Sequence, residues 1–308
     1  MTETHRPGLM NESARDLPGG HAPAPEIPTR LLVHALVRDD GTVAMGELYA
    51  VAAALTMTDQ QVRLCVKRLV AEGRFTQHGR GRQGTLHATA DVTGSIAPEV
   101  DYVRYAYRQD RGLAPWDGTW HLFAFVVPET NRAARDALRD SLLQLGAAAV
   151  QGGLYVSANP IHQQVEAQAQ HLGIQAALTT LTSSDLKIGD LSEPTRLAAA
   201  LWPLNELAAR YQQLATLAES HLGRLAQGVP IDETDQLTMA VELAAAFSQA
   251  MKPDPLLPPE LLSQPWPGAE ARRLAAECWS ALLDRSPGGS RHPRLFQLYT
   301  DTVAEEER

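Results

Sequence analysis

The chain has 308 residues, of which 44% are hydrophobic, and a formal net charge of −9. This length suffices for two or three domains with buried cores, whereas no apolar run approaches the roughly 18 residues of a membrane helix and no secretory signal pattern stands near the start. The two cysteines, Cys65 and Cys278, show no metal-ligand spacing and no disulfide framework, so we expect a cytoplasmic protein.

The N-terminal part begins with a polar leader and continues with helical patterns. Residues 1–25 are rich in Gly, Pro, Ala and charge without any hydrophobic period, which is typical of a disordered leader. Apolar residues at helical spacing from Ile27 to Leu36 predict a first helix, which Asp39-Asp40-Gly41 should end. A second short helix is predicted over residues 47–55.

A strong helix start signal follows at Thr58. The Thr58 hydroxyl can accept from the amide of Gln61, and the Gln61 side chain can reach back to the Thr58 backbone, which together make a capping box. Behind it, one apolar stripe is formed by Val62, Val66, Leu69 and Val70. The other face carries the long polar side chains of Gln60, Arg63, Lys67 and Arg68.

A short basic hairpin is predicted directly after this helix. Two strand-like runs, residues 74–78 and 85–89, flank the glycine-rich segment 79–84. A polar-faced helix followed by a basic hairpin is the outline of a winged helix-turn-helix, here over residues 26–91. Residues 60–90 contain six Arg and Lys against one Glu, although the whole chain is acidic. Such a basic island suits phosphate binding; the alternative is an ordinary solvated helix face beside a surface turn. The predicted DNA contacts are Thr58, Gln60, Gln61, Arg63, Lys67, Arg68, Arg80 and Arg82.

The middle of the chain alternates between strand and helix patterns. A linker over residues 92–115 contains a predicted helix at 98–109, whose tyrosines favour packing between domains or between subunits. The central unit spans residues 116–190. Its predicted elements are a strand at 121–127, a helix at 129–145, strands at 147–151 and 154–157, a helix at 160–172 and a strand at 174–182. The order β-α-β-β-α-β predicts a ferredoxin-like domain.

Strand patterns are missing from the C-terminal unit, residues 191–308. Residues 195–226 form one long helical pattern with a possible break at Trp202-Pro203, and further helices are predicted at 232–251 and 268–284. A proline-dense segment, 253–267, separates these last two helices. The unit ends in an acidic tail, so negative charge is kept apart from the basic N-terminal island. The predicted fold class is therefore α+β.

The chain resembles the PaaX family of bacterial transcription regulators, the repressors of phenylacetic acid catabolism. Four stretches of sequence carry the resemblance: 58–63 with 68–70; 116–120 with 127–129 and 135–139; 202–211; and 254–262 followed by Trp266-Pro267-Gly268. The last of these is the most specific, because a segment so dense in proline is rare in unrelated chains. The resemblance implies a homodimeric repressor of a catabolic operon, bound to double-stranded operator DNA and released by an acyl- or aryl-coenzyme A effector. We expect no cofactor and no metal. The hairpin departs from relatives that carry aromatic residues after the basic turn, so operator preference does not transfer.

The sequence allows two interpretations of the residues that could form an effector pocket. An aromatic acyl group could lie against Trp116, Trp120 and Trp202, while the phosphates of coenzyme A could pair with Arg135, Arg139 or Arg210. The alternative is that the tryptophans fill domain interfaces and the arginines solvate helix faces, which are the usual roles of these residue types.

An enzymatic function is less well supported. The central unit also looks similar to CRISPR-associated spacer-acquisition nucleases, in which an acidic residue at the end of the first strand can hold a metal ion. Val127-Pro128 occupies that place here, and Glu129 is expected to cap the next helix. The ten histidines show no ligand spacing. We therefore predict that the chain is not an enzyme; a nucleic-acid-processing enzyme and a protein-binding adaptor stay as alternatives.

Overall fold

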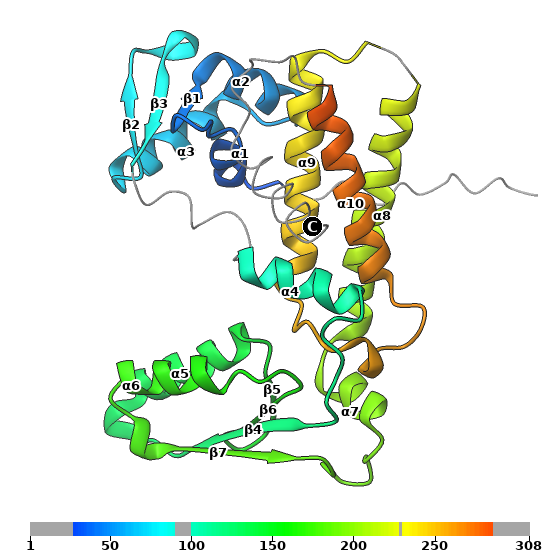
Figure 1. Cartoon of the computed structure of the whole chain (residues 1–308). Helices are drawn as coiled ribbons and strands as arrows, with labels where there is room; N and C mark the ends of the chain where they lie inside the picture. The colour runs from blue at the N-terminus through cyan, green and yellow to red at the C-terminus, as the bar shows by residue number, and fades with distance from the viewer. Residues whose placement is uncertain (1–26, 90–99, 228–229, 286–308) are drawn as a thin grey trace, which may run out of the picture.

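The computed structural model describes residues 27–89, 100–227 and 230–285 (Figure 1). The predicted leader and the end of the acidic tail lie outside these residues. The chain is a mixed α+β structure with two antiparallel sheets and a helical C-terminal part. No helix within the described ranges is both long and apolar enough to cross a membrane.

The N-terminal region, residues 27–89, combines three helices with a small sheet. Its elements are α1 (Thr29–Ala35), β1 (Thr42–Ala44), α2 (Met45–Ala54), α3 (Asp59–Ala71), β2 (Phe75–His78), the 3₁₀ turn η1 (Gly81–Gln83) and β3 (Thr85–Ala88). The sheet order is β1-β3-β2, and both pairs are antiparallel. Strand β1 was not predicted, because three residues are too few to show a period of two; its pairing with β3 holds it in place.

The central region contains a second sheet with helices on one side. Its elements are β4 (Trp120–Phe125), η3 (Glu129–Asn131), α5 (Arg132–Gln144), β5 (Ala148–Gln151), β6 (Leu154–Ser157), α6 (His162–His171), η4 (Gln175–Ala177) and β7 (Leu178–Ser183). The strand order β5-β6-β4-β7 is antiparallel throughout. Strand β6 thus lies between β4 and β5, which is the arrangement of a split β-α-β unit. The last strand begins four residues later than predicted, because residues 175–177 form a 3₁₀ turn.

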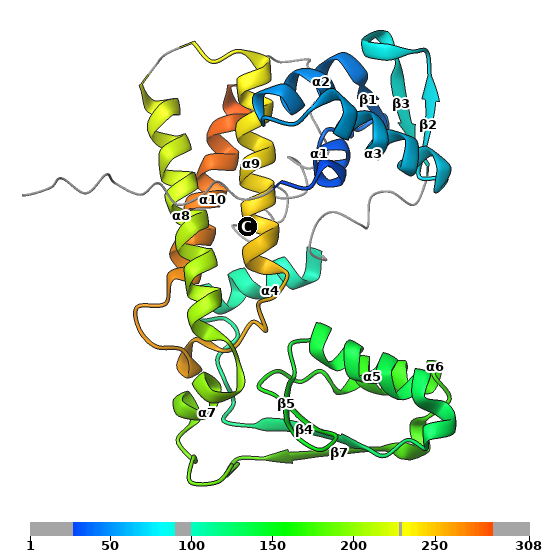
Figure 2. The same cartoon turned by 180° about the vertical axis from the view of Figure 1, so that it is seen from behind.

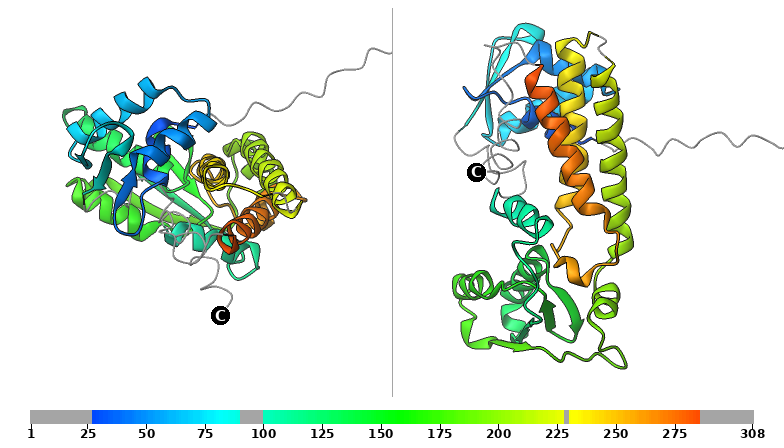
Figure 3. Two further views of the ribbon diagram at one scale, coloured as in Figure 1. Left: turned by 90° about the horizontal axis from the view of Figure 1, so that it is seen from above. Right: turned by 45° about the vertical axis from the view of Figure 1, so that its right-hand side comes forward.

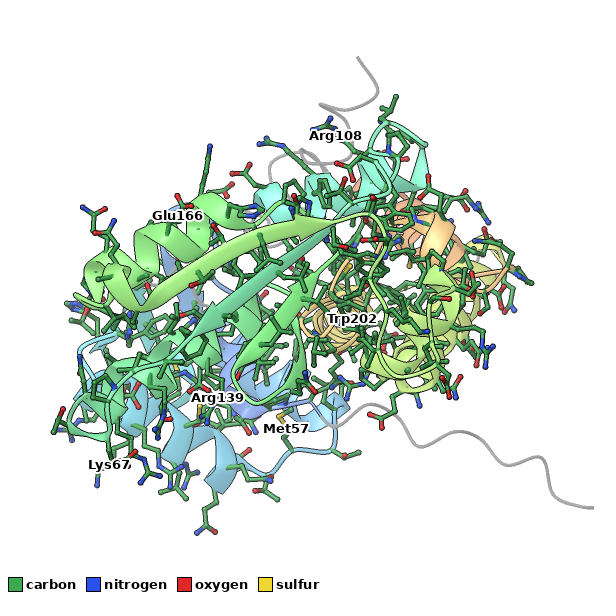
Figure 4. The ribbon with its side chains drawn as sticks, turned by 90° about the horizontal axis from the view of Figure 1, so that it is seen from below. Met57, Lys67, Arg108, Arg139, Glu166 and Trp202 are labelled. Carbon is green, nitrogen blue, oxygen red and sulfur yellow. The ribbon has the colours of Figure 1, made fainter. Side chains whose placement is uncertain are left out.

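Alternation along β4 gives this sheet two different faces. Phe123 and Phe125 belong to the core formed with α5 and α6. Trp120 and Leu122 point the other way and belong to a separate core with α7 and the proline-dense segment. Figure 4 looks onto the sheet from this second side. One face of the sheet therefore packs against α5 and α6, and the other against α7 and the proline-dense segment.

The C-terminal region is built from helices. Its elements are α7 (Pro194–Leu201), α8 (Leu204–Ala226), α9 (Glu233–Met251), the 3₁₀ turn η5 (Pro259–Leu261) and α10 (Pro267–Asp284), while α4 (Val100–Asp110) is the linker helix. The predicted helix at 195–226 is divided in two. Trp202, which precedes Pro203, has extended angles (φ −119°, ψ 148°), as steric conflict with the proline ring requires.

Helices α8, α9 and α10 lie side by side as a bundle, seen end-on in Figure 3 and from the back in Figure 2. Helices α1 and α2 pack against α9. One hydrophobic core therefore runs from Leu32 and Val51 in the N-terminal region to Met251 and Trp279 in the bundle. The N-terminal region is joined to the C-terminal helices through this shared core.

A buried arginine connects the linker helix to the bundle. Arg272 of α10 is only 4% exposed. Its Nε and Nη2 atoms donate to the two carboxylate oxygens of Asp110 at 2.7 and 2.6 Å, and its Nη1 donates to the hydroxyl of Tyr211 at 2.7 Å. Burial by itself would lower the pKa of Arg272, but Tyr211, Asp110 and Asp254 together raise it, so the guanidinium keeps its charge.

Asp254 brings the proline-dense segment into the same network. Its carboxylate accepts from the Tyr211 hydroxyl and from the amide of Leu256 at 2.8 Å, and it lies 3.7 Å from Nη1 of Arg272. Burial raises the pKa of Asp254, an effect that Arg272 opposes. The hydroxyl of Tyr102, from α4, donates to the main-chain oxygen of Asp254. We call the set Tyr102, Asp110, Tyr211, Asp254 and Arg272 the polar hub.

The central region is attached beside the polar hub. The Asn159 side-chain amide donates to the carbonyl oxygens of Pro255 and Leu256 at 3.1 and 3.0 Å. Gly146 (φ +83°) allows a close approach, because a Cβ atom there would come within 2.9 Å of Pro255 main-chain atoms. Trp202 donates from Nε1 to the carbonyl oxygen of Gly146 at 3.0 Å. The proline-dense segment thus contacts the central region through Asn159 and Gly146, and the linker helix and the bundle through Asp254.

Replacement of Arg272 by Ala tests the polar hub. It would leave Asp110 and Asp254 without their buried counter-charge, and breaking such a pair costs about 3–5 kcal/mol. Urea denaturation should show this loss. Arg273→Ala is the matched control, since Arg273 is adjacent, exposed and paired only with surface carboxylates, which contribute little. Equal stability of the two variants would contradict the role given to Arg272.

A second prediction concerns His34. This side chain is buried against Phe75, with ring centroids 5.4 Å apart, and neither ring nitrogen has a hydrogen-bond partner among the described residues. Burial, helped by Arg30, lowers its pKa to about 4. On acidification, His34 therefore takes up a proton at a higher pH in the unfolded chain than in the folded chain. The free energy of unfolding should fall as the pH decreases from about 6.5 towards 4. Between pH 7 and 4.5, wild type should lose about 2–3 kcal/mol more than His34→Leu in urea denaturation. Parallel pH profiles of the two proteins would refute this.

Candidate nucleic-acid interface

The start of α3 is fixed by the capping box. The amide of Gln61 donates to Thr58 Oγ1 at 3.2 Å, and the amide of Thr58 donates to Gln61 Oε1 at 2.7 Å. Val62, Val66 and Leu69 are buried below. Thr58 and Gln61, both proposed as DNA contacts, thus have a structural role in which their side chains already hold the helix end.

The opposite face of α3 is open to solvent. The exposed side chains on it include Gln60, Arg63, Lys67 and Arg68, together with the apolar Leu64. Lys67 lies at the periphery of the molecule in Figure 4. This face is available to a long anionic partner, because the core side of α3 already faces α1 and α2.

The basic hairpin tip is placed next to the start of α3. Asp59 Oδ2 lies 3.7 Å from Nη2 of Arg63 and 3.9 Å from Nη2 of Arg82. The two arginine side chains are 70% and 68% exposed, so these pairs are weak and leave both cations accessible. The Arg82 guanidinium also lies 5.7 Å from the ring centre of Tyr49. Asp59 and Tyr49 were missed in the sequence, since contacts between separate elements have no local signal.

Close packing on α2 fixes the position of the tip. The Met45 amide donates to the carbonyl oxygen of Gly84 at 3.0 Å. A Cβ atom at Gly46 would come within 3.1 Å of the Arg82 carbonyl oxygen, so a larger residue there would press the tip outward by a few tenths of an ångström. Arg80 is exposed and forms no ion pair within the described part of the chain. The α3 face and the tip together form one exposed basic surface, made of Arg63, Lys67, Arg68, Arg80 and Arg82, which we call the basic surface.

The tryptophans expected at an effector pocket come together as a packed cluster. Trp116 and Trp120 meet edge to face with ring centroids 5.2 Å apart, and Trp120 stacks on Trp202 at 6.3 Å. Trp120 is 1% exposed and Trp202 7%. They fill the space between β4, α7 and the proline-dense segment.

The arginines expected at the same pocket are placed elsewhere. Arg135 and Arg139 belong to α5, on the opposite side of the sheet from Trp120, and bond to Glu129 at 2.9 Å and to Asp140 at 3.0 Å. Arg210 of α8 donates to the carbonyl oxygen of Gln249 at 3.3 Å. Glu129 does not cap α5, so that expectation was wrong; its carboxylate is held by Arg135 instead. Over the described ranges, no group of three or more His, Cys, Asp or Glu side chains is close enough to bind a metal ion.

Two family models match this chain. Residues 113–198 match the PaaX protein central Cas2-like domain, and residues 202–289 match the PaaX-like protein C-terminal domain. Together these matches cover more than half of the sequence. No curated protein matches it. Among solved structures, an uncharacterized protein from Mycobacterium tuberculosis is similar at 21% identity, over 78% of this chain and 88% of that one, with a TM-score of 0.44.

Proposed function

Because the chain belongs to the PaaX family, we propose that it is a DNA-binding transcriptional repressor of genes for phenylacetic acid catabolism. The observation that carries this proposal is the basic surface on α3 and the hairpin tip. It lies on an otherwise acidic chain, and its cations are exposed and weakly paired. Cations in this state can replace the counterions of DNA phosphates.

The N-terminal region is proposed to be a winged helix-turn-helix. Its element order α1-β1-α2-α3-β2-β3 supports this interpretation, as does a sheet in which β3 lies between β1 and β2. In this arrangement α3 enters the major groove and the β2–β3 hairpin is the wing. Gln60 and Arg63, near the N-terminal end of α3, would then meet base edges, where Gln suits adenine and Arg suits guanine.

We further propose that the protein binds its operator as a homodimer. A pseudo-palindromic operator presents two equivalent half-sites, about one helical turn or a multiple of it apart. A protein with two-fold symmetry presents two α3 helices to match them.

The effector is proposed to be an acyl- or aryl-coenzyme A thioester. An effector releases DNA only if it binds more tightly to the state that does not bind DNA, and a typical coupling of about 1–3 kcal/mol weakens binding roughly 5- to 150-fold. A pocket that used both the tryptophan cluster and Arg135 or Arg139 would have to reach around the sheet, because these groups lie on its opposite sides. We therefore favour an effector site whose lining residues all lie on one side of the sheet.

The base-reading role of α3 is tested by Arg63→Ala. The variant should lose about 1–3 kcal/mol of operator affinity and should tolerate base changes at one operator position. Arg132→Ala, an exposed arginine on the central region, is the control and should bind like wild type. Fluorescence anisotropy with a set of single-base operator variants measures both effects. Cleavage of the duplex on addition of Mg²⁺ would instead favour a nucleic-acid-processing enzyme.

The role of the wing is tested by neutralising Arg80 and Arg82 together. Each lost phosphate contact should reduce the slope of log affinity against log salt by about 0.9, so the slope should flatten by nearly 2. Base preference should be kept, in contrast to Arg63→Ala. A slope equal to that of wild type would place the hairpin outside the interface.

A further inference from the structure

A cavity of about 700 Å³ lies between the linker helix and the central region. Its walls come from α4, from the C-terminal end of α5, from α6 and from the chain just after α9, and include Tyr102, Tyr105, Leu145, Gln164, Gln168 and Lys252. This volume is in the range of small-molecule sites, about 300–1,000 Å³. The cavity lies on the α5–α6 side of the sheet, away from the tryptophan cluster.

One wall of this cavity is held by hydrogen bonds that do not involve a ligand. The hydroxyl of Tyr102 donates to the main-chain oxygen of Asp254, and the hydroxyl of Tyr105 donates to Asn159 Oδ1 at 2.9 Å. Asn159 is itself fixed to Pro255 and Leu256. Because both hydroxyls are engaged, the aromatic rings are fixed in place, and a ligand would find this wall already formed.

The remaining lining offers polar groups and one positive charge. Gln144, Gln164 and Gln168 present side-chain amides, which can donate to a carbonyl oxygen. Lys252 is exposed and has no ion-pair partner among the described residues. The carboxylate of Asp101 at the same cavity lies 3.2 Å from Arg104. The lining therefore suits an apolar group joined to a carbonyl and to a negative charge.

We propose that this cavity binds the acyl part of the effector, an aromatic or aliphatic acyl group. The acyl chain lies against the rings of Tyr102 and Tyr105, its carbonyl oxygen accepts from the glutamine amides, and Lys252 faces the negative charge. A free carboxylic acid supplies that charge from its carboxylate and a coenzyme A thioester from a phosphate. This inference rests on the proposed function as a ligand-controlled repressor.

Contacts of the cavity walls give a route from the ligand to the DNA-binding region. Helix α4 follows residues 90–99, the segment that leads from the N-terminal region. Lys252 directly follows α9, the helix on which α1 and α2 pack. A ligand in this cavity touches α4 and also the residue that follows α9, the helix on which the N-terminal region packs. If their relative position differs between the free and DNA-bound states, the ligand has the differential affinity that release requires.

The first test fills the cavity. Gln164→Trp places a large side chain in it, whereas Gln163→Trp alters an exposed neighbour on the same helix that does not line it. Calorimetric titration uses phenylacetic acid, phenylacetyl-coenzyme A and coenzyme A. The acid or the thioester should bind wild type and Gln163→Trp alike, and about tenfold or more weakly to Gln164→Trp. Binding of the thioester but not the acid identifies the coenzyme A part as necessary for binding.

The second test removes the charge. Lys252→Met should weaken ligand binding about two- to fivefold, as for an exposed ion pair, and Lys187→Met, at an exposed lysine outside the cavity, should not. All four variants should bind operator like wild type in the absence of ligand. The inference is overturned if Gln164→Trp binds ligand as wild type does, if coenzyme A alone binds as tightly as its thioester, or if neither acid nor thioester binds. Failure of wild type to bind any operator refutes the proposed function instead, so the two failures are distinguishable.

Discussion

The arrangement of this protein depends on the burial of a single positive charge, that of Arg272. A buried guanidinium is tolerated only when its partners are close and well oriented, and here they come from separate parts of the chain: Asp110 at the end of α4, Tyr211 in α8 and Asp254 in the proline-dense segment. Loss of either carboxylate would remove part of the counter-charge of the guanidinium, and loss of Tyr211 would remove one of its hydrogen bonds. The polar hub therefore fixes the linker helix and the bundle relative to one another more strictly than apolar contacts alone would.

The segment that most specifically indicated the family, residues 254–262 with Trp266-Pro267-Gly268, is explained by this junction. Asp254 supplies a hub carboxylate, Leu256 has a positive φ of 50°, and Leu257 and Leu261 fill the core on the second face of the sheet. Prolines restrict the backbone of the unfolded segment and lower the entropy lost on folding. The sequence pattern thus reports how the central region is attached to the bundle, and says nothing about which DNA is bound.

The sequence predicted those features that local chemistry determines. The capping box at Thr58 and Gln61 located the start of α3, the stripe from Val62 to Leu69 identified its buried face, and Pro203 marked a real break between helices. Contacts between elements distant in sequence were not predictable: the three residues of β1, the approach of Asp59 to Arg82, and the opposite placement of Trp120 and Arg135 across the sheet. A period of two shows that a strand has two faces, but not which helix covers each face.

Magnitudes limit how an effector can act on this structure. A coupling free energy of about 1–3 kcal/mol is smaller than the roughly 3–5 kcal/mol needed to leave one partner of a buried ion pair alone. The proposed effector would therefore act at lower cost by leaving Arg272 and Asp110 paired than by separating them. The structural changes that the proposed effector could drive most easily are those at contacts between helices that bury no charged group. The contact of α1 and α2 with α9 is mainly of this kind, since its shared core is apolar, although the partly buried pair Arg38–Glu47 lies near Glu233 of α9. A small shift of α9 relative to α1 and α2, with the hub unbroken, would then move the basic surface as a unit and change its fit to the proposed operator.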